Sequence, residues 1–109
     1  MTYNRSPLGL KQPPLVSKAI RKSARGEGCT LRLSVCTHDP ETVVFAHLRF
    51  FGWAGVAQKP HDLLGVYACV ACHSALDSRA EGLWGFEDIL RAHGETLMCL
   101  HAKGLVTTK

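Results

Sequence analysis

The amino-acid sequence predicts a small α+β domain that is held together by a cluster of cysteines. Its 109 residues suit one domain, and a composition of 46% hydrophobic and 20% charged residues is typical of a globular protein. Apolar strand-like segments alternate with helical patterns, and a periodic helix lies near the C-terminus. A domain of this size buries a modest core, so a cross-link would contribute much of its stability.

The N-terminal residues 1–17 predict a basic arm, and the folded domain is expected to span 18–109. Six bases and no acid fall within residues 1–26, whereas the remaining residues carry seven bases and nine acids. Pro7, Pro13 and Pro14 indicate an extended backbone in the arm. A basic arm on a near-neutral body is a common way of gripping a polyanion, although a solvated tail would show the same charge pattern.

In the first half of the domain, Ser17 is a suitable cap for a short basic helix over 18–24. Residues 30–35 alternate between apolar and polar side chains, as in a half-buried strand. The spacing predicts further strands at 42–50 and 63–68, of which the second leads directly into a cysteine. These segments predict the sheet.

The second half predicts two helices. Residues 73–81 are expected to form a helix that ends at Gly82, and apolar residues at three- and four-residue steps predict a longer helix over 86–103. Residues 105–107 are expected to add a short edge strand. Residues 51–62 contain two glycines and a proline and predict a long loop, which in so small a domain is usually either functional or disordered.

Four cysteines have the spacing of metal ligands. Cys69 and Cys72 are separated by two residues, and Cys29 and Cys36 by six, which is wider than usual. Four thiolates form the closed ligand set of a structural zinc site, with Zn–S distances of about 2.3 Å. The alternative is that all four are small buried hydrophobic residues, as we expect for Cys99.

The cellular compartment affects whether these cysteines bind a metal ion. Residues 1–12 lack the apolar stretch of a secretory signal, and no apolar run approaches the ~20 residues that span a bilayer. The chain is therefore expected in the cytoplasm and away from membranes, where cysteines favour metal ligation over disulfides.

The segment 69–73 (CVACH) also matches the attachment motif of a c-type haem, for which Met98 could be an axial ligand. Covalent haem attachment takes place in exported proteins, and the haem hypothesis leaves Cys29 and Cys36 without a role. The sequence therefore favours zinc.

Two histidines lie where they could take part in chemistry. His47 falls on a predicted strand and His73 at the start of a predicted helix, so the order strand, strand, helix could hold them on either side of a shallow cleft. A neutral imidazole can take a proton from water, and a second imidazole can bind a divalent cation. The spacing alone favours the alternative, in which His47 is a partly buried strand residue and His73 is a helix-start residue near the zinc.

Four motifs resemble the YbcO-like family of prophage-encoded nucleases, which is grouped with the HNH (His-Me finger) endonucleases. They are RGEGC at 25–29, AHLR at 46–49, KPHDL at 59–63 and ACVACH at 68–73, and the resemblance covers about residues 18–105. It implies a zinc-stapled ββα-metal (HNH-like) core that acts on DNA, with a C-terminal helix and a basic N-terminal arm.

The resemblance also implies roles for single residues. His47 would be the general base, His73 a ligand of the catalytic divalent ion, and Asp62 the middle residue of the motif and a second ligand. The family's zinc ligands correspond to Cys29, Cys36, Cys69 and Cys72. Many HNH enzymes carry Asp or His immediately before the general base, whereas this chain has Ala46. The catalytic ion would then depend on His73 and a loop residue, either His61 or Asp62.

The leading hypothesis is therefore a metal-dependent DNA endonuclease of phage or prophage origin that hydrolyses phosphodiester bonds. It would contain a structural Zn²⁺ and use Mg²⁺ or another divalent cation in catalysis. Its phosphate contacts are expected from basic residues of the arm and strand: Lys18, Arg21, Lys22, Arg25 and Arg49. The alternatives are a non-catalytic zinc-containing module that binds nucleic acid, and a zinc ribbon that binds protein.

Overall fold

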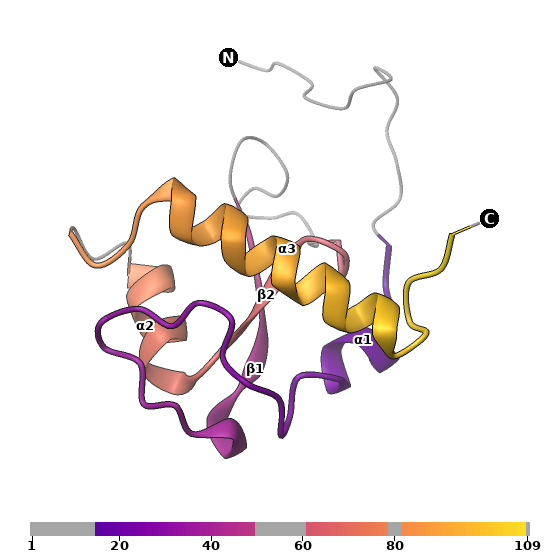
Figure 1. Ribbon diagram of the computed structural model, residues 1–109, viewed down its shortest axis with the longest axis horizontal. Helices are drawn as coiled ribbons and strands as arrows, with labels where there is room; N and C mark the ends of the chain where they lie inside the picture. The colour runs from indigo at the N-terminus through magenta and orange to yellow at the C-terminus, as the bar shows by residue number, and fades with distance from the viewer. Residues whose placement is uncertain (1–14, 50–60, 79–81, 109) are drawn as a thin grey trace, which may run out of the picture.

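The computed structural model describes residues 15–49, 61–78 and 82–108, which form a small α+β fold (Figure 1). Its elements are α1 (Lys18–Lys22), the 3-10 turn η1 (Pro40–Thr42), β1 (Val44–His47), β2 (Gly65–Ala68), α2 (Val70–Ser78) and α3 (Phe86–Ala102). The predicted class and the order strand, strand, helix are confirmed, although each strand is shorter than predicted. The arm up to residue 14 and most of the predicted loop 51–62 lie outside the described residues.

The sheet has two antiparallel strands, with Val44 opposite Ala68 and His47 opposite Gly65. All four residues of β2 are buried, because α3 lies across this strand in Figure 1 while β1 pairs with it along one edge. Phe45 of β1 packs edge-on against the Tyr67 ring at a centroid distance of 6.4 Å. The sheet therefore forms the middle of the domain and places His47 at one end of it.

Gly65 is required where β2 begins. A Cβ built at this position would overlap the Phe45 ring and would also lie 2.9 Å from the Ala46 carbonyl oxygen. We expect Gly65→Ala to lower the free energy of unfolding by about 1–3 kcal/mol, the usual cost of overpacking a core. Gly28→Ala is the matched control in urea unfolding, because no atom lies within 4 Å of its added Cβ. Equal stability of the two variants would contradict this reading of Gly65.

Residues 30–35 do not form the predicted strand. Thr30 N–H donates to the Tyr67 carbonyl (2.8 Å), and Tyr67 N–H donates back to Thr30 Oγ1 (3.1 Å), so one threonine covers the free edge of β2. Arg32 then adopts a left-handed φ of 45°, and Cys36 N–H closes a turn onto the Leu33 carbonyl (2.9 Å). A left-handed residue cannot continue a strand, so the alternating pattern was misleading.

The long helix α3 is confirmed, but its buried stripe differs from the apolar spacing in the sequence. The buried positions are Ile89, Ala92, Thr96 and Leu100, whereas Phe86 and Leu90 are exposed. Ala92 lets the helix approach the sheet closely, and Thr96 Oγ1 bonds to Thr30 Oγ1 at 3.0 Å. The predicted edge strand at 105–107 is absent, since residues 105 and 106 form a bend after the helix and 107 is irregular. None of the described helices is long and apolar enough to cross a membrane.

Candidate metal centre and active site

The four predicted cysteine ligands come together in space. Cys69 follows β2 directly and Cys72 lies in the first turn of α2, while Cys29 and Cys36 belong to the segment between α1 and η1. Their Sγ atoms all lie within 4.8 Å of one another, and the Cys36 and Cys69 sulfurs are 3.8 Å apart. A tetrahedral ion with bonds of about 2.3 Å would space its sulfur ligands by about 3.8 Å. The cluster can therefore hold a metal ion, and all four thiols are free of disulfides.

Backbone N–H groups point at these sulfurs and favour thiolates. Cys69 N–H donates to Cys29 Sγ at 3.3 Å, and Arg32 N–H donates to the same sulfur at 3.5 Å. Burial would raise the pKa of Cys69, but the N–H groups of Cys72 and Thr37 outweigh it and lower that pKa to about 6. For Cys72 burial prevails, and its pKa is raised. This donor set suits a thiophilic cation, which would deprotonate the remaining thiols.

Two side chains of α3 hold the segment that follows Cys29. The Arg91 guanidinium donates to the Thr30 and Leu31 carbonyls, both at 2.7 Å. The Arg32 guanidinium donates two hydrogen bonds to the Glu95 carboxylate, at 2.7 and 2.8 Å, and this ion pair lowers the pKa of Glu95. The sequence did not identify these braces, because Arg91 and Glu95 are spaced like an ordinary solvated pair along one helix.

Arg91→Ala is expected to lower the free energy of unfolding by about 1–3 kcal/mol, since it removes two charge-assisted hydrogen bonds. It should also release the metal faster to a chelator, because residues that hold the ligands in place typically change metal affinity about 10–100-fold. Arg91→Lys retains the charge but cannot reach both carbonyls as the planar fork does, so it should restore only part of the loss. Unchanged chelator kinetics in Arg91→Ala would contradict the bracing role.

His47 and Asp62 form a close pair, whereas the family resemblance placed Asp62 with His73. Asp62 is only 3% exposed, and its Oδ1 lies 2.7 Å from Nε2 of His47. An ionised carboxylate can only accept hydrogen bonds, so Nε2 carries a proton, and in the neutral form of the ring the lone pair is then on Nδ1. No described residue hydrogen-bonds to Nδ1. The Phe45 ring packs edge-on against the imidazole at 5.3 Å and limits its rotation.

The other oxygen of Asp62 is held from the N-terminal side of the domain. Ser17 N–H donates to Oδ2 at 2.7 Å, and Arg21 Nε lies 3.2 Å from the same atom. Burial would raise the pKa of Asp62, but the Ser17 amide, His47 and Arg21 together lower it. The carboxylate therefore stays ionised at neutral pH. No local pattern could have predicted these partners, because they lie more than 40 positions away from Asp62 in the chain.

His73 has a different neighbour from the one expected. Its Nε2 lies 3.0 Å from Oδ2 of Asp77, one turn further along α2. Within the described ranges, the four cysteines are the only group of three or more potential metal ligands that lie together, so His73 and Asp62 do not form such a group. The other loop candidate, His61, accepts a hydrogen bond from Leu15 N–H at 2.8 Å through Nδ1.

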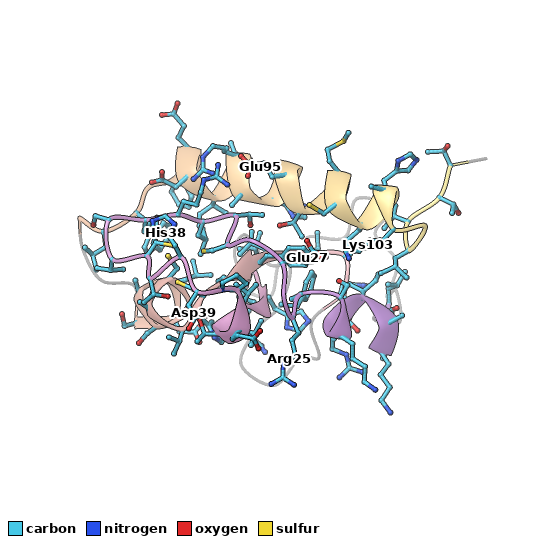
Figure 2. All side chains as sticks on the ribbon, turned by 60° about the horizontal axis from the view of Figure 1, so that its bottom comes forward. Arg25, Glu27, His38, Asp39, Glu95 and Lys103 are labelled. Carbon is cyan, nitrogen blue, oxygen red and sulfur yellow. The ribbon has the colours of Figure 1, made fainter. Side chains whose placement is uncertain are left out.

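The predicted phosphate contacts lie around this site. Lys18, Arg21 and Lys22 are exposed on α1, which packs beside β1, and Arg49 follows β1. Figure 2 shows Arg25 pointing away from the body of the domain, whereas nearby Glu27 is engaged by Lys103. Among the described residues only Arg21 of this set forms an ion pair.

Fold and site together define a small cysteine-cluster α+β domain that carries a histidine–carboxylate pair beside a basic helix. The chain belongs to the YbcO family, because the model described as "Putative nuclease YbcO" matches residues 18–105. The expected family and its phage or prophage origin are confirmed.

Relatives with the same description occur in a bacterium and in a phage. The chain is 48% identical over 61 residues to "Putative nuclease YbcO" of Escherichia coli (strain K12) and, to the same extent, to "Putative nuclease ybcO" of Enterobacteria phage 82. Each match covers 55% of this chain and 64% of the relative, so it spans less than two thirds of the relatives' length. The solved structure titled "Structure of a putative bacteriophage protein from Escherichia coli str. K-12 substr. MG1655" is similar, with a TM-score of 0.64 and 34% identity. It aligns over 79% of this chain and all of its own.

Proposed function

We propose that this protein is a DNA endonuclease with an HNH-like site, in which His47 is the general base. The observation that carries the proposal is the His47–Asp62 pair at 2.7 Å, which fixes one ring nitrogen and leaves Nδ1 as a proton acceptor. Membership in a family described as nuclease supports the reaction class. The substrate, the HNH relationship and the mechanism are our inference from this geometry.

In the proposed reaction, the oxygen of a water molecule attacks the phosphorus of a phosphodiester. Nδ1 of His47 takes the proton of that water as the new P–O bond forms, and the bond to the leaving oxygen breaks. The leaving oxygen then takes a proton from solvent. Asp62 stays ionised, orients the ring and stabilises the imidazolium that forms, as a buried carboxylate does in a catalytic triad.

The four cysteines would hold a structural Zn²⁺. A site with four thiolate ligands is closed and has no open position for water, so its contribution is to the stability of the fold. The same free thiols suit a reducing compartment, and we propose the cytoplasm as the place where the protein acts.

A divalent cation such as Mg²⁺ remains a candidate at His73, where it would supply positive charge close to the reacting phosphate. The carboxylate beside His73 is that of Asp77, whereas both oxygens of Asp62 are engaged by other groups. The described residues therefore do not complete the expected His73–Asp62 ligand pair. We assign Asp62 to His47 instead.

The exposed bases of α1 and the residues around it would contact the DNA backbone. Contacts to phosphates release counterions, so binding should weaken steeply as salt rises. Salt-insensitive or absent DNA binding would favour the protein-binding zinc ribbon.

The test is nicking of a supercoiled plasmid by the purified protein with Mg²⁺ or Mn²⁺, and with a chelator that spares the zinc. The proposal expects conversion to the open circle by the wild type. A protein that shifts the plasmid on a gel but leaves it intact would instead be the non-catalytic zinc-containing module that binds nucleic acid.

A further inference from the structure

Leu15, Ser17 and Arg21, which begin the described part of the chain, all contact Asp62. We propose that Arg21, together with the Ser17 amide, is a positioning residue that holds the Asp62 carboxylate in register with His47. This inference rests on the proposed function, and it separates Arg21 from the exposed bases that contact phosphates only.

The N-terminal segment pairs with residues 61 and 62 through the backbone. Asp62 N–H donates to the Leu15 carbonyl at 2.8 Å, and Leu15 N–H donates to His61 Nδ1 at 2.8 Å. Ser17 N–H then reaches Oδ2 of Asp62 at 2.7 Å. Two of these hydrogen bonds hold the main chain and the side chain of Asp62, and the third holds the neighbouring His61.

Helix α1, which carries Arg21, is itself well anchored. Ser17 Oγ accepts Ile20 N–H as the helix cap, and Ile20 and Ala24 are 3% and 1% exposed in the core. Ser23 Oγ lies 2.7 Å from the Tyr67 hydroxyl, which connects the helix to β2. The position of Arg21 is therefore set by the same core that sets the position of His47.

Arg21 then fixes the orientation of the carboxylate. Asp62 can rotate about the bond to its carboxylate, and holding Oδ2 between the Ser17 amide and Arg21 Nε (3.2 Å) turns Oδ1 toward His47. The side chain of Arg21 is 47% exposed, whereas that of Asp62 is 5% exposed, so the guanidinium covers the carboxylate from the solvent side. Lys18 and Lys22, on the same helix, have no ion-pair partner among the described residues.

The experiment compares Arg21→Gln with Arg21→Lys, and with Lys22→Gln as a variant that removes an equal charge from the same helix. Arg21→Gln should lower kcat by about 10- to 100-fold with little change in KM, because a misplaced catalytic group typically costs about that much. Arg21→Lys should recover part of kcat. Lys22→Gln should raise KM, as the loss of one phosphate contact does.

A second readout does not depend on activity. ¹⁵N NMR of the imidazole should show one fixed tautomer for His47 in the wild type, with the proton on Nε2, and a mixture of tautomers in Arg21→Gln. If Arg21→Gln only raises KM, as in Lys22→Gln, and keeps the fixed tautomer, the inference is overturned. If the wild type does not nick DNA, the proposed function fails, and the NMR comparison alone then supports or overturns the positioning role.

Discussion

Replacement of Cys72 by serine is expected to unfold the domain. The side chain of Cys72 is fully buried, and its sulfur is one of four that lie within 4.8 Å of one another. A structural zinc contributes about 10–16 kcal/mol of apparent folding free energy at neutral pH. A whole domain is stable by only about 5–15 kcal/mol, so the loss of one ligand exceeds what the rest of the core can offset. Circular dichroism and elemental analysis of the purified variant would measure fold and zinc content.

The matched control is Cys99→Ser, because Cys99 is half-buried in α3 and lies outside the cluster. It should stay folded and retain about one equivalent of zinc per chain, as the wild type should. A strong chelator should unfold the wild type and Cys99→Ser alike. If Cys72→Ser remained folded, or if the wild type contained no zinc, the cysteines would be small core residues instead.

His47→Ala is expected to lower the rate of plasmid nicking by about 10²–10⁴-fold, the usual contribution of a general base. The fold should persist, because the side chain of His47 is only partly buried (19% exposed). Asp62 also keeps its contacts with Ser17 and Arg21. DNA binding should change little. The rate of open-circle formation and the gel shift should be measured on the same preparation, so that a loss of binding is not mistaken for a loss of chemistry.

Two further histidine variants complete this comparison. His73→Ala should stay folded and lose activity if His73 binds the divalent cation, whereas unfolding would make His73 structural. His101→Ala should nick like the wild type, because His101 is an exposed residue near the end of α3. Nicking by His47→Ala at the wild-type rate would remove His47 from the chemistry.

Local patterns in the sequence predicted much of the domain. The Cys69-x-x-Cys72 spacing predicted half of the cysteine cluster, because two ligands one helical turn apart need no long-range information. The periodicity of α3 and the order of β1, β2 and α2 were predicted for the same reason. The family resemblance pointed to His47 and Asp62 as site residues, but it placed Asp62 with His73, and the pairing of Asp62 with His47 is known only from the structure.

The remainder depends on contacts between distant residues. Thr30 was predicted to lie in a strand because apolar and polar residues alternate after it. In the structure its side-chain oxygen accepts the Tyr67 N–H, as the carbonyl of a neighbouring strand would. Ala92 and Thr96 were missed as core residues because neither is strongly hydrophobic. Ala92 is buried where the helix approaches the sheet, and Thr96 is buried with its hydroxyl bonded to Thr30. The attachment of Arg21 to Asp62 joins two segments that no local pattern connects.

The bond between Thr30 and Thr96 has a consequence for how the domain forms during synthesis. A two-stranded hairpin is marginal on its own, and here the edge of β2 is completed by Thr30, which is in turn held by α3. Arg91 and Glu95, which brace the cysteine segment, are also on that helix. During synthesis, the cysteines and the His47–Asp62 pair are therefore translated before the helix that holds their segments in place. We expect the cysteine cluster and the His47–Asp62 pair to reach their final geometry only after α3 has left the ribosome.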